Sequence, residues 1–262
     1  MSSLGTELRH PTAVIDPQAE LAESVIVGPY TVIGAGVTIG ERVRIGPHAY
    51  IERETTIGDD CQIATGAVLG TDPQDLKYAG EHTFLEIGPR TVIREYATLN
   101  RGTAASGKTT VGSDCLIMAY VHVAHDCRIG NHVILANAVN MGGHVEIADW
   151  AIVGGVTALH QFVHIGEHAF VGGGSRVPQD VAPYVTVAGN PCAAFGLNIT
   201  GLRRRGFSKE AVAALRSAYR TIFQGELNTR QALDRLDEEG PHPEEVQRLI
   251  QFIRDSSRGI TT

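Results

Sequence analysis

Aliphatic residues recur at every sixth position along most of the chain. The series runs from Ile15 to Val177, and 25 of its 28 positions are Ile, Leu, Val or Met. An amphipathic helix needs apolar residues three and four positions apart, and a half-buried strand needs them at every second position. A period of six matches neither pattern. It is typical of a solenoid in which each repeat adds one short strand and one turn.

A second inward position follows four residues after each aliphatic one. It is filled by small or β-branched residues such as Thr31, Val43, Cys61, Cys115 and Cys127, and glycine often follows the aliphatic residue directly. Two inward side chains and a turn per hexapeptide indicate a parallel β-helix. The pattern resembles the left-handed β-helix of hexapeptide-repeat proteins, in which three repeats make one triangular coil. The cysteines at these positions are expected to be packing residues.

Two segments, near residues 71–84 and 103–110, interrupt the repeat. A solenoid accommodates insertions as loops that leave the coil, so both segments are expected to be excursions. The first carries charges and an aromatic residue where exposure is expected, and loops of this length inside compact domains are commonly functional. It is predicted to be a binding loop, with a solvated excursion as the alternative.

The period is lost near residue 190, where the apolar residues take helical spacing. "SKEAVAALRSAYRTIFQ" is the first such segment, and two more amphipathic segments follow, separated by Gly and Pro. The sequence therefore predicts a mainly β chain of two domains. These are a β-helix of hexapeptide repeats over residues 1–191 and a small α-helical domain over residues 192–262.

Composition and charge exclude several classes of protein. A net charge of -7 argues against a general nucleic-acid binder, which needs a basic face. Four cysteines without C-x-x-C spacing indicate neither a zinc knuckle nor a thioredoxin-like pair. No window approaches the apolar length of a membrane span, and the N-terminus lacks the pattern of a signal peptide. We expect a cytoplasmic protein without an integral membrane segment.

Histidines are expected to gather on one edge of the solenoid. Positions eighteen apart should stack on successive coils, which gives two adjacent columns: His125, Gly143 and Gln161, and Asp126, His144 and Phe162. His122 and His160 lie beside these columns. Clustered histidines next to an aspartate indicate either a metal site, such as a three-histidine zinc site, or a general base with polar substrate contacts. The spacing leaves both possibilities open.

Four longer strings carry a more specific resemblance. They are "QDLKYAGE", "AHDCRIGNHVILAN", "GGVTALHQF" and "FGLNITGLRRRGFS". Together they resemble the family of UDP-N-acetylglucosamine O-acyltransferases, which open lipid A biosynthesis. The resemblance covers nearly the whole chain, including the first loop and the helical tail.

The resemblance implies a reaction and a set of roles. The family moves an (R)-3-hydroxyacyl group from acyl carrier protein to the 3-hydroxyl of the glucosamine ring of UDP-GlcNAc, without a metal or other cofactor. His125 is implied as the general base, Asp126 as the residue that orients it, and the backbone N–H of Gly143 as the oxyanion donor. Substrate contacts are implied for Asp75, Lys77, His122, His144, His160, Gln161, Asn198, Arg204 and Arg205.

The family also assembles as a homotrimer, and "RIGNHVILANAVNMGG" offers an apolar, amide-rich face for such packing. Gly172, Gly173 and Gly174 fall where the family sets acyl length, and three glycines predict an open groove and a long hydroxyacyl chain. Two positions depart from the family pattern. Thr200 replaces a usual glutamate and Pro191 a common histidine, so nucleotide contacts are expected to differ in detail.

Three other functions are compatible with a β-helix of this kind. The sister N-acyltransferase acts on the amine of an O-acylated sugar nucleotide, but it usually has an additional N-terminal domain, whereas here the repeat begins near Ile15. A zinc-dependent hydratase on the same fold would need neither "DLKY" nor "RRRGF". A non-catalytic scaffold would use the solenoid for assembly alone.

Overall fold

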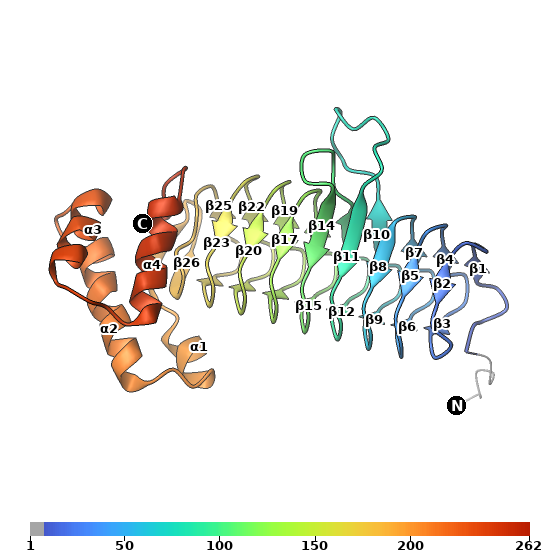
Figure 1. Cartoon of the computed structure of the whole chain (residues 1–262), viewed down its shortest axis with the longest axis horizontal. Coiled ribbons are helices and arrows are strands. Elements are labelled where there is room, and N and C mark those ends of the chain that lie inside the picture. The colour runs from blue at the N-terminus through green and yellow to red at the C-terminus, as the bar shows by residue number, and fades with distance from the viewer. Residues whose placement is uncertain (1–7) are drawn as a thin grey trace.

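Short parallel strands wind into a three-sided prism, and consecutive strands belong to its three sheets in turn (Figure 1). The structure is a computed structural model that describes residues 8–262. Most strands contain two residues, because each hexapeptide has one inward side chain in the strand and the other in the corner before it. Strand paired to strand along each face gives the continuous ladder of a parallel β-helix, as the period of six predicts.

Each face of the prism is one sheet. The first face contains β1 (Val14–Ile15), β4 (Val32–Ile33), β7 (Tyr50–Ile51), β10 (Val68–Thr71), β13 (Thr98–Asn100), β16 (His122–Val123), β19 (Asn140–Met141), β22 (Ala158–Leu159) and β25 (Arg176–Val177). The second contains β2 (Glu20–Leu21), β5 (Thr38–Ile39), β8 (Thr55–Ile57), β11 (Phe84–Ile87), β14 (Lys108–Val111), β17 (Arg128–Ile129), β20 (Glu146–Ile147) and β23 (His164–Ile165). The third contains β3 (Ile26–Val27), β6 (Arg44–Ile45), β9 (Gln62–Ile63), β12 (Val92–Ile93), β15 (Leu116–Ile117), β18 (Ile134–Leu135), β21 (Ile152–Val153), β24 (Phe170–Val171), β26 (Val185–Ala188) and β27 (Ala193–Leu197).

The interior of the prism is filled by the residues of the six-residue series. Ile51, Leu69 and Leu99 are fully buried, and the second inward position is buried as well. Cys61 and Cys115 lie at that second position, where burial raises the pKa of each thiol to about 11. They are therefore protonated and act as small apolar residues, in agreement with the expected packing role.

The corners between faces form three edges that carry the chemistry. The histidine edge joins the first and second faces and includes residues 124–127, 142–145 and 160–163. The aromatic edge joins the second and third faces and includes residues 148–151 and 166–169. The glycine edge joins the third and first faces and includes residues 154–157 and 172–175.

One residue at most corners has a left-handed backbone conformation, whatever its side chain. Asp126 has φ of 61°, Trp150 of 64° and Val156 of 57°. This conformation is strained for a residue with a Cβ, especially a β-branched one. It persists because backbone hydrogen bonds to the coils above and below fix each corner, as in His144 N–H to His125 O at 3.0 Å.

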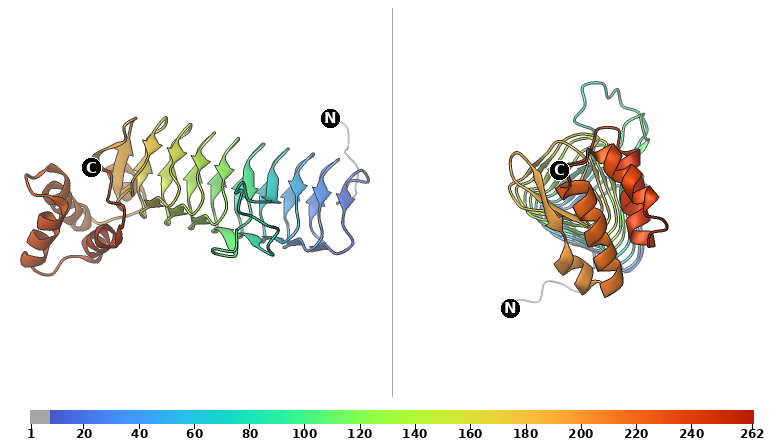
Figure 2. Two further views of the ribbon diagram at one scale, coloured as in Figure 1. Left: turned by 90° about the horizontal axis from the view of Figure 1, so that it is seen from above. Right: turned by 90° about the vertical axis from the view of Figure 1, so that its left-hand side faces the viewer.

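Both loop excursions leave the coil at the histidine edge, on the same side of the prism (Figures 1 and 2). The first spans residues 72–83, between β10 and β11. The second spans residues 101–107, between β13 and β14, and is shorter than predicted. Lys108, Thr109 and Thr110 belong to β14, where they pair with β11, so the coil resumes earlier than the sequence indicated.

The tail contains α1 (Ile199–Arg204), α2 (Lys209–Tyr219), the π-helical turn η1 (Arg220–Gln224), α3 (Thr229–Glu238) and α4 (Glu244–Asp255). Residues 192–262 are predicted to form a small α-helical domain; these helices are present, and β27 is a strand that precedes them. It pairs antiparallel with β26 and so extends the third face by one strand. No helix within residues 8–262 has the length and apolar character needed to cross a membrane.

After α4 the chain returns to the prism as the return segment, residues 256–261. The Ser256 hydroxyl donates to Asp180 Oδ2 at 2.7 Å, and the Thr261 N–H donates to Asp180 O at 2.7 Å. The end of the helical tail is thus fixed to the coil that follows β25.

Candidate active site

His125 and Asp126 form a hydrogen-bonded pair at the histidine edge, directly after β16. His125 Nδ1 lies 2.7 Å from Asp126 Oδ2. The Asp126 side chain is fully buried, whereas the His125 side chain retains 14% exposure. The pair therefore combines an enclosed carboxylate with an imidazole that a substrate can reach.

The short loop supplies further donors to the Asp126 carboxylate. Thr103 donates its N–H to Oδ1 at 2.9 Å and its hydroxyl to Oδ2 at 2.7 Å, and the Ser106 hydroxyl donates to Oδ1. Burial alone would raise the pKa of Asp126, but the hydrogen bonds from Ser106, His125 and Thr103 outweigh it and lower the pKa to about 2. An ionised carboxylate only accepts, so Nδ1 of His125 carries a proton, and in the neutral ring the lone pair is on Nε2.

Gly143 lies beneath the His125 ring on the next coil. A Cβ at this position would lie 2.6 Å from His125 Cε1 and 2.7 Å from Nε2, so no larger residue fits while the ring stays in place. The Gly143 carbonyl accepts from Phe162 N–H at 3.0 Å, while its own N–H has no acceptor among the described residues. A free N–H beside the imidazole suits a developing oxyanion.

His144 completes this cluster from the corner of the next coil. Its Nε2 lies 3.6 Å from Asp126 Oδ2, and its ring stacks on Phe162 at a centroid distance of 4.5 Å. The ligand atoms of His125, Asp126 and His144 lie within 4.8 Å of one another, which is close enough for a shared metal ion. However, each carboxylate oxygen already accepts two hydrogen bonds, so the arrangement does not fit a cation without loss of a donor.

His122 lies on the same coil as His125, on β16 of the first face. Its Nδ1 is 2.8 Å from the Thr98 hydroxyl on the preceding coil. Burial, with a smaller contribution from nearby His125, lowers the pKa of His122, so this ring is neutral near pH 7. A neutral imidazole with one fixed nitrogen offers the other for a substrate hydrogen bond.

His160 and Gln161 lie one coil beyond Gly143, and both are exposed. His160 Nδ1 is 2.9 Å from Gln161 O, and the same carbonyl accepts from Arg258 at 2.5 Å. Arg258 belongs to the return segment, 97 residues further along the chain. Sequence reasoning missed it, because nothing in the tail indicates that its last residues return to the histidine edge.

Asp75 and Lys77 lie in the first loop, where Asp75 Oδ1 accepts the Lys77 N–H at 3.0 Å and the Lys77 residue is exposed. Arg101 fixes this loop. Its guanidinium is buried, donates to Gly70 O at 2.6 Å and approaches the Tyr78 hydroxyl at 3.0 Å. Arg101 was not selected from the sequence, because it lies before the interruption at residues 103–110.

The tail residues lie elsewhere, at the aromatic edge. Asn198 donates to His168 O at 3.0 Å, and Arg205 donates to Trp150 O at 2.9 Å with its guanidinium carbon 5.4 Å from the Trp150 ring centroid. Arg204 lines a pocket of about 410 Å³ on the third face, together with Asn198 and Thr200. Pro191 is exposed between β26 and β27.

Gly172, Gly173 and Gly174 lie at the glycine edge. A Cβ on Gly173 would lie 3.2 Å from Gly155 O, and one on Gly174 would meet nothing within 4 Å. The predicted site residues of one chain therefore fall into three groups on three different edges. The structure brings His122, His125, Asp126, Gly143 and His144 together, with Asp75, Lys77, His160 and Gln161 along the same edge, but not with the tail residues or the three glycines.

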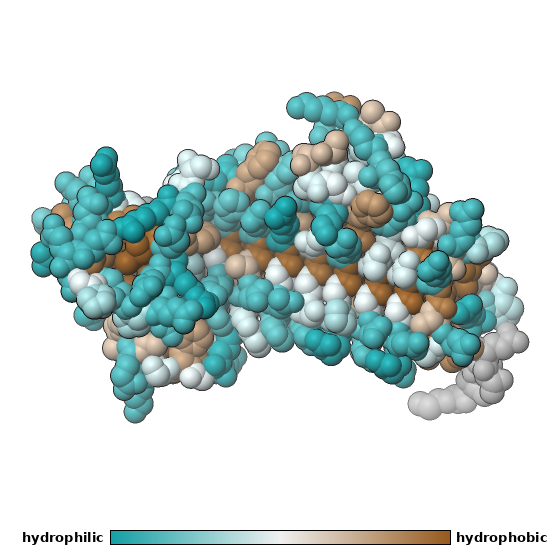
Figure 3. All heavy atoms as spheres, viewed as in Figure 1, coloured by the Kyte–Doolittle hydropathy of each residue, from teal (hydrophilic) through white to brown (hydrophobic). Residues whose placement is uncertain are grey.

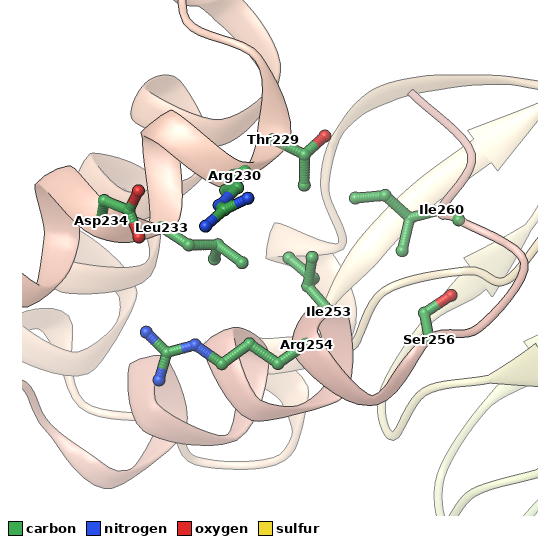
Figure 4. Close-up of a pocket in the computed structure, with 9 residues that line it drawn as sticks. Thr229, Arg230, Leu233, Asp234, Ile253, Arg254, Ser256 and Ile260 are labelled. Carbon is green, nitrogen blue, oxygen red and sulfur yellow. The ribbon is translucent and has the colours of Figure 1, made fainter.

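A separate pocket of about 440 Å³ lies between α3, α4 and the return segment (Figure 4). Arg230, Leu233 and Asp234 of α3 face Ile253 and Arg254 of α4 across it. It contains none of the residues that the sequence predicts for the site.

Comparison with known proteins places this geometry in context. Residues 180–261 match the family described as "Udp N-acetylglucosamine O-acyltransferase; Domain 2", and residues 36–71 and 108–143 match "Bacterial transferase hexapeptide (six repeats)". The acyl-[acyl-carrier-protein]--UDP-N-acetylglucosamine O-acyltransferase of Paraburkholderia phymatum is 50% identical over 256 residues, covering 96% of this chain and 98% of that protein. The enzyme of the same name from Myxococcus xanthus is 50% identical over 253 residues, again covering 96% of this chain and 98% of that protein.

Solved structures agree with the sequence matches. The crystal structure of UDP-N-acetylglucosamine O-acyltransferase from Moraxella catarrhalis has a TM-score of 0.94 and 43% identity, covering 98% of this chain and all of that chain. These matches confirm the predicted left-handed parallel β-helix with a short helical tail, and they support neither the sister N-acyltransferase nor a zinc-dependent hydratase. The chain belongs to the family of UDP-N-acetylglucosamine O-acyltransferases.

Proposed function

We propose that this chain transfers an (R)-3-hydroxyacyl group from acyl carrier protein to the 3-hydroxyl of the glucosamine ring of UDP-GlcNAc, the first step of lipid A biosynthesis. The observation that carries the proposal is the position of His125 Nε2 against the backbone of Gly143. A general base and an oxyanion donor on adjacent coils are the two groups that acyl transfer to an alcohol requires.

In the proposed reaction, His125 Nε2 removes the proton of the sugar 3-hydroxyl as its oxygen attacks the thioester carbonyl carbon. Asp126 stabilises the imidazolium that forms, and the Gly143 N–H donates to the carbonyl oxygen as negative charge develops there. The C–S bond then breaks, and the carrier thiolate takes the proton back from His125. The products are the O-acylated sugar nucleotide and the free thiol of the carrier protein.

The remaining predicted residues receive substrate roles in this proposal. His122, neutral and held by Thr98, and exposed His160 and Gln161 offer hydrogen bonds around the acceptor hydroxyl. Lys77, in the exposed loop, offers a cation to the substrate phosphates. Asp75, His144, Asn198, Arg204 and Arg205 complete the set, the arginines as partners for the diphosphate.

We further propose that the active enzyme is a homotrimer with each site shared between chains. Within one chain, His125 lies at the histidine edge, Arg204 beside the third face and Gly173 at the glycine edge. The aromatic and glycine edges bound the third face, so a second copy that presents its third face to the histidine edge would bring the groups together. Exposed apolar corner residues, Tyr120 at 61%, Val156 at 73% and Phe162 at 52%, support such contacts.

Figure 3 shows a row of hydrophobic residues along the prism, bordered by hydrophilic side chains. Light scattering coupled to size exclusion tests the assembly, and a mass near three times 28.0 kDa is expected. A monomer that retains full activity would contradict a shared site.

We also propose that the enzyme is cytoplasmic. The four cysteines are free, which fits a reducing compartment.

The acyl group is proposed to be long, because Gly172, Gly173 and Gly174 present no side chain at the glycine edge. Gly173→Met would fill this edge and is expected to shift the preference of the enzyme toward donors with shorter acyl chains.

Thr200 has a shorter side chain than the glutamate usual in the family, so the nucleotide is expected to lose one carboxylate contact in the pocket beside Arg204.

The test is a mass-resolved assay of purified protein with UDP-GlcNAc and 3-hydroxyacyl carrier proteins of several chain lengths. A single mono-acylated product with wild type, and none with His125→Ala, is the expected result. The absence of product with every donor would refute O-acylation of UDP-GlcNAc. Product only with a 3-amino analogue would identify an amine as the acceptor.

A further inference from the structure

We propose that Thr103 and Ser106, on the short loop of residues 101–107, are positioning residues for the reaction. Their hydroxyl groups hold the Asp126 carboxylate against Nδ1 of His125 and so fix which nitrogen of the base is free. The inference rests on the proposed function and deepens it, because it assigns the short loop a part in setting up the base.

The contacts account for the whole acceptor capacity of the carboxylate. Oδ1 accepts from the Thr103 N–H at 2.9 Å and from the Ser106 hydroxyl, and Oδ2 accepts from the Thr103 hydroxyl at 2.7 Å and from His125 at 2.7 Å. A carboxylate has about four lone-pair sites, and here each one has a donor. The orientation of Asp126 is therefore set by the loop and not by His125 alone.

Ser106 has one hydroxyl hydrogen and two acceptors within reach. The Lys108 carbonyl lies 2.9 Å from Ser106 Oγ, and Asp126 Oδ1 lies closer. A bond to an ionised oxygen is about twice as strong as one to a neutral carbonyl, so the hydrogen goes to the carboxylate. The Thr103 hydroxyl has no such conflict, because it donates to Asp126 and accepts the Ala105 N–H at 3.2 Å.

Two imidazoles compete for Asp126 Oδ2. His125 Nδ1 lies at 2.7 Å, and His144 Nε2 lies at 3.6 Å on the next coil. A modest rotation of the carboxylate would exchange these partners and leave His125 free to adopt the tautomer with the proton on Nε2. That tautomer cannot accept the proton of the sugar hydroxyl at Nε2. The donors of Thr103 and Ser106 oppose this rotation, because they bind both carboxylate oxygens.

The charged and titratable groups around Asp126 favour the same arrangement. His125 and His144 face it from the histidine edge, and the Asp126 N–H donates to the neutral Thr109 hydroxyl at 2.8 Å. Cys127 lies behind it in the core, where burial raises the thiol pKa to about 12. Lys108 of β14 pairs with Glu86 at 2.9 Å, and Arg101 of the loop pairs with Asp72, so the loop offers Asp126 hydroxyl and N–H donors but no cation.

The test uses Ser106→Ala, Thr103→Val and the double variant in the full-length protein. Outer-shell partners of a catalytic group typically contribute 10-fold to 100-fold, so we expect kcat to fall by about that range in the double variant. KM for UDP-GlcNAc should change less than about twofold, because neither residue is proposed to touch substrate.

Rescue and control variants separate positioning from folding. Thr103→Ser and Ser106→Thr keep a hydroxyl and should retain most of the activity. Thr110→Val is the control. It removes a hydroxyl from β14, the strand that follows the loop; this hydroxyl makes no hydrogen bond to Asp126 among the described residues, and the variant should behave as wild type. An unchanged kcat in the double variant would overturn the proposal, and so would a loss confined to KM.

A readout without turnover distinguishes the inference from the proposed function. ¹⁵N resonances of histidine-labelled protein, assigned by subtraction of His125→Gln, should report Nδ1 protonation in wild type and a mixture of tautomers in the double variant. If wild type acylates nothing, the function is wrong, and the tautomer result still decides whether the loop holds Asp126. A wild-type tautomer in the double variant would refute the positioning role.

Discussion

The histidine edge and the aromatic edge present histidines on the same backbone and give them opposite properties. His144 at one edge and His168 at the other both occupy the left-handed corner position, with φ of 59° and 56°. Near His144, His125 contacts a buried carboxylate and keeps an open face. His168 is buried between Trp150 and Tyr184, and burial, assisted by Arg205, lowers its pKa.

The difference shows that the repeat determines where a side chain lies, while its neighbours determine what it does. His168 Nδ1 is buried and has no hydrogen-bond partner in the part of the chain described, and its ring also meets Phe207 edge-on. Such a ring contributes apolar contact area at the junction with the tail. A histidine column in a β-helix therefore indicates a base only where a carboxylate reaches it.

The largest contrast is expected between His125→Ala and His168→Ala. Loss of a general base typically costs 10²-fold to 10⁴-fold, so His125→Ala should lower kcat/KM by about that factor and leave the melting temperature nearly unchanged. His168→Ala should do the reverse, with a clear drop in melting temperature and activity within about fivefold, because its removal leaves a cavity. An inactive but stable His168→Ala protein would contradict the purely structural role of His168.

Gly143→Ala should have the second-largest effect. Its Cβ would lie 2.6 Å from His125 Cε1, so the ring must shift and the N–H moves away from the carbonyl oxygen that it is proposed to bind. Loss of one oxyanion donor typically costs 10²-fold to 10³-fold in kcat, and we expect a reduction of about this size. Gly34→Ala, whose Cβ would meet Arg53 N at 3.2 Å on a distant coil, is the control and should stay within about twofold.

Phe207→Ala tests whether the aromatic edge stabilises the junction between prism and tail. Phe207 packs edge-on against His168 at a centroid distance of 4.9 Å and against Tyr184 at 6.0 Å. Removal of this half-buried ring should lower the free energy of unfolding by about 2 kcal/mol. Phe195→Ala, at 70% exposure on β27, should change it by less than about 0.5 kcal/mol in the same urea titration.

The smallest effect concerns acid stability. The pKa of Asp126 is lowered from 3.8 to about 2, so its stabilising contribution is complete above pH 3.8 and is lost as the pH falls toward 2. It should amount to at most about 2 kcal/mol. Asp126→Asn lacks this contribution, so its unfolding free energy should fall less between pH 4 and pH 2 than that of wild type. Parallel curves for the two proteins in urea titrations would refute the lowered pKa.

Much of the fold follows from the sequence, because a strict period of six allows few alternatives. The columns of positions eighteen apart place His125 over Gly143 and Asp126 over His144, and the structure has both contacts. Strand β27 was not foreseen, since "AAFGL" follows the end of the period and pairs antiparallel.

The residues that hold His125, Asp126 and Gln161 in place could not be predicted from the six-residue period. Thr103 and Ser106 lie in an interruption, where the period gives no register, and Arg258 reaches Gln161 only because the return segment folds back. The separation of Arg204 from His125 onto different edges was equally hidden. Spacing along the chain fixes position on the prism only while the repeat lasts, and Arg204 lies beyond it.

Trp150 is the single tryptophan of the chain, and its surroundings make it an intrinsic optical probe. The indole stacks on His132 at a centroid distance of 3.8 Å and lies under the Arg205 guanidinium. Selective excitation of Trp150 reports on the junction between prism and tail, because no other tryptophan contributes to the emission. Nucleotide binding, dissociation of the proposed trimer and melting of the junction between prism and tail can thus be followed by emission in unlabelled protein, each in a separate titration.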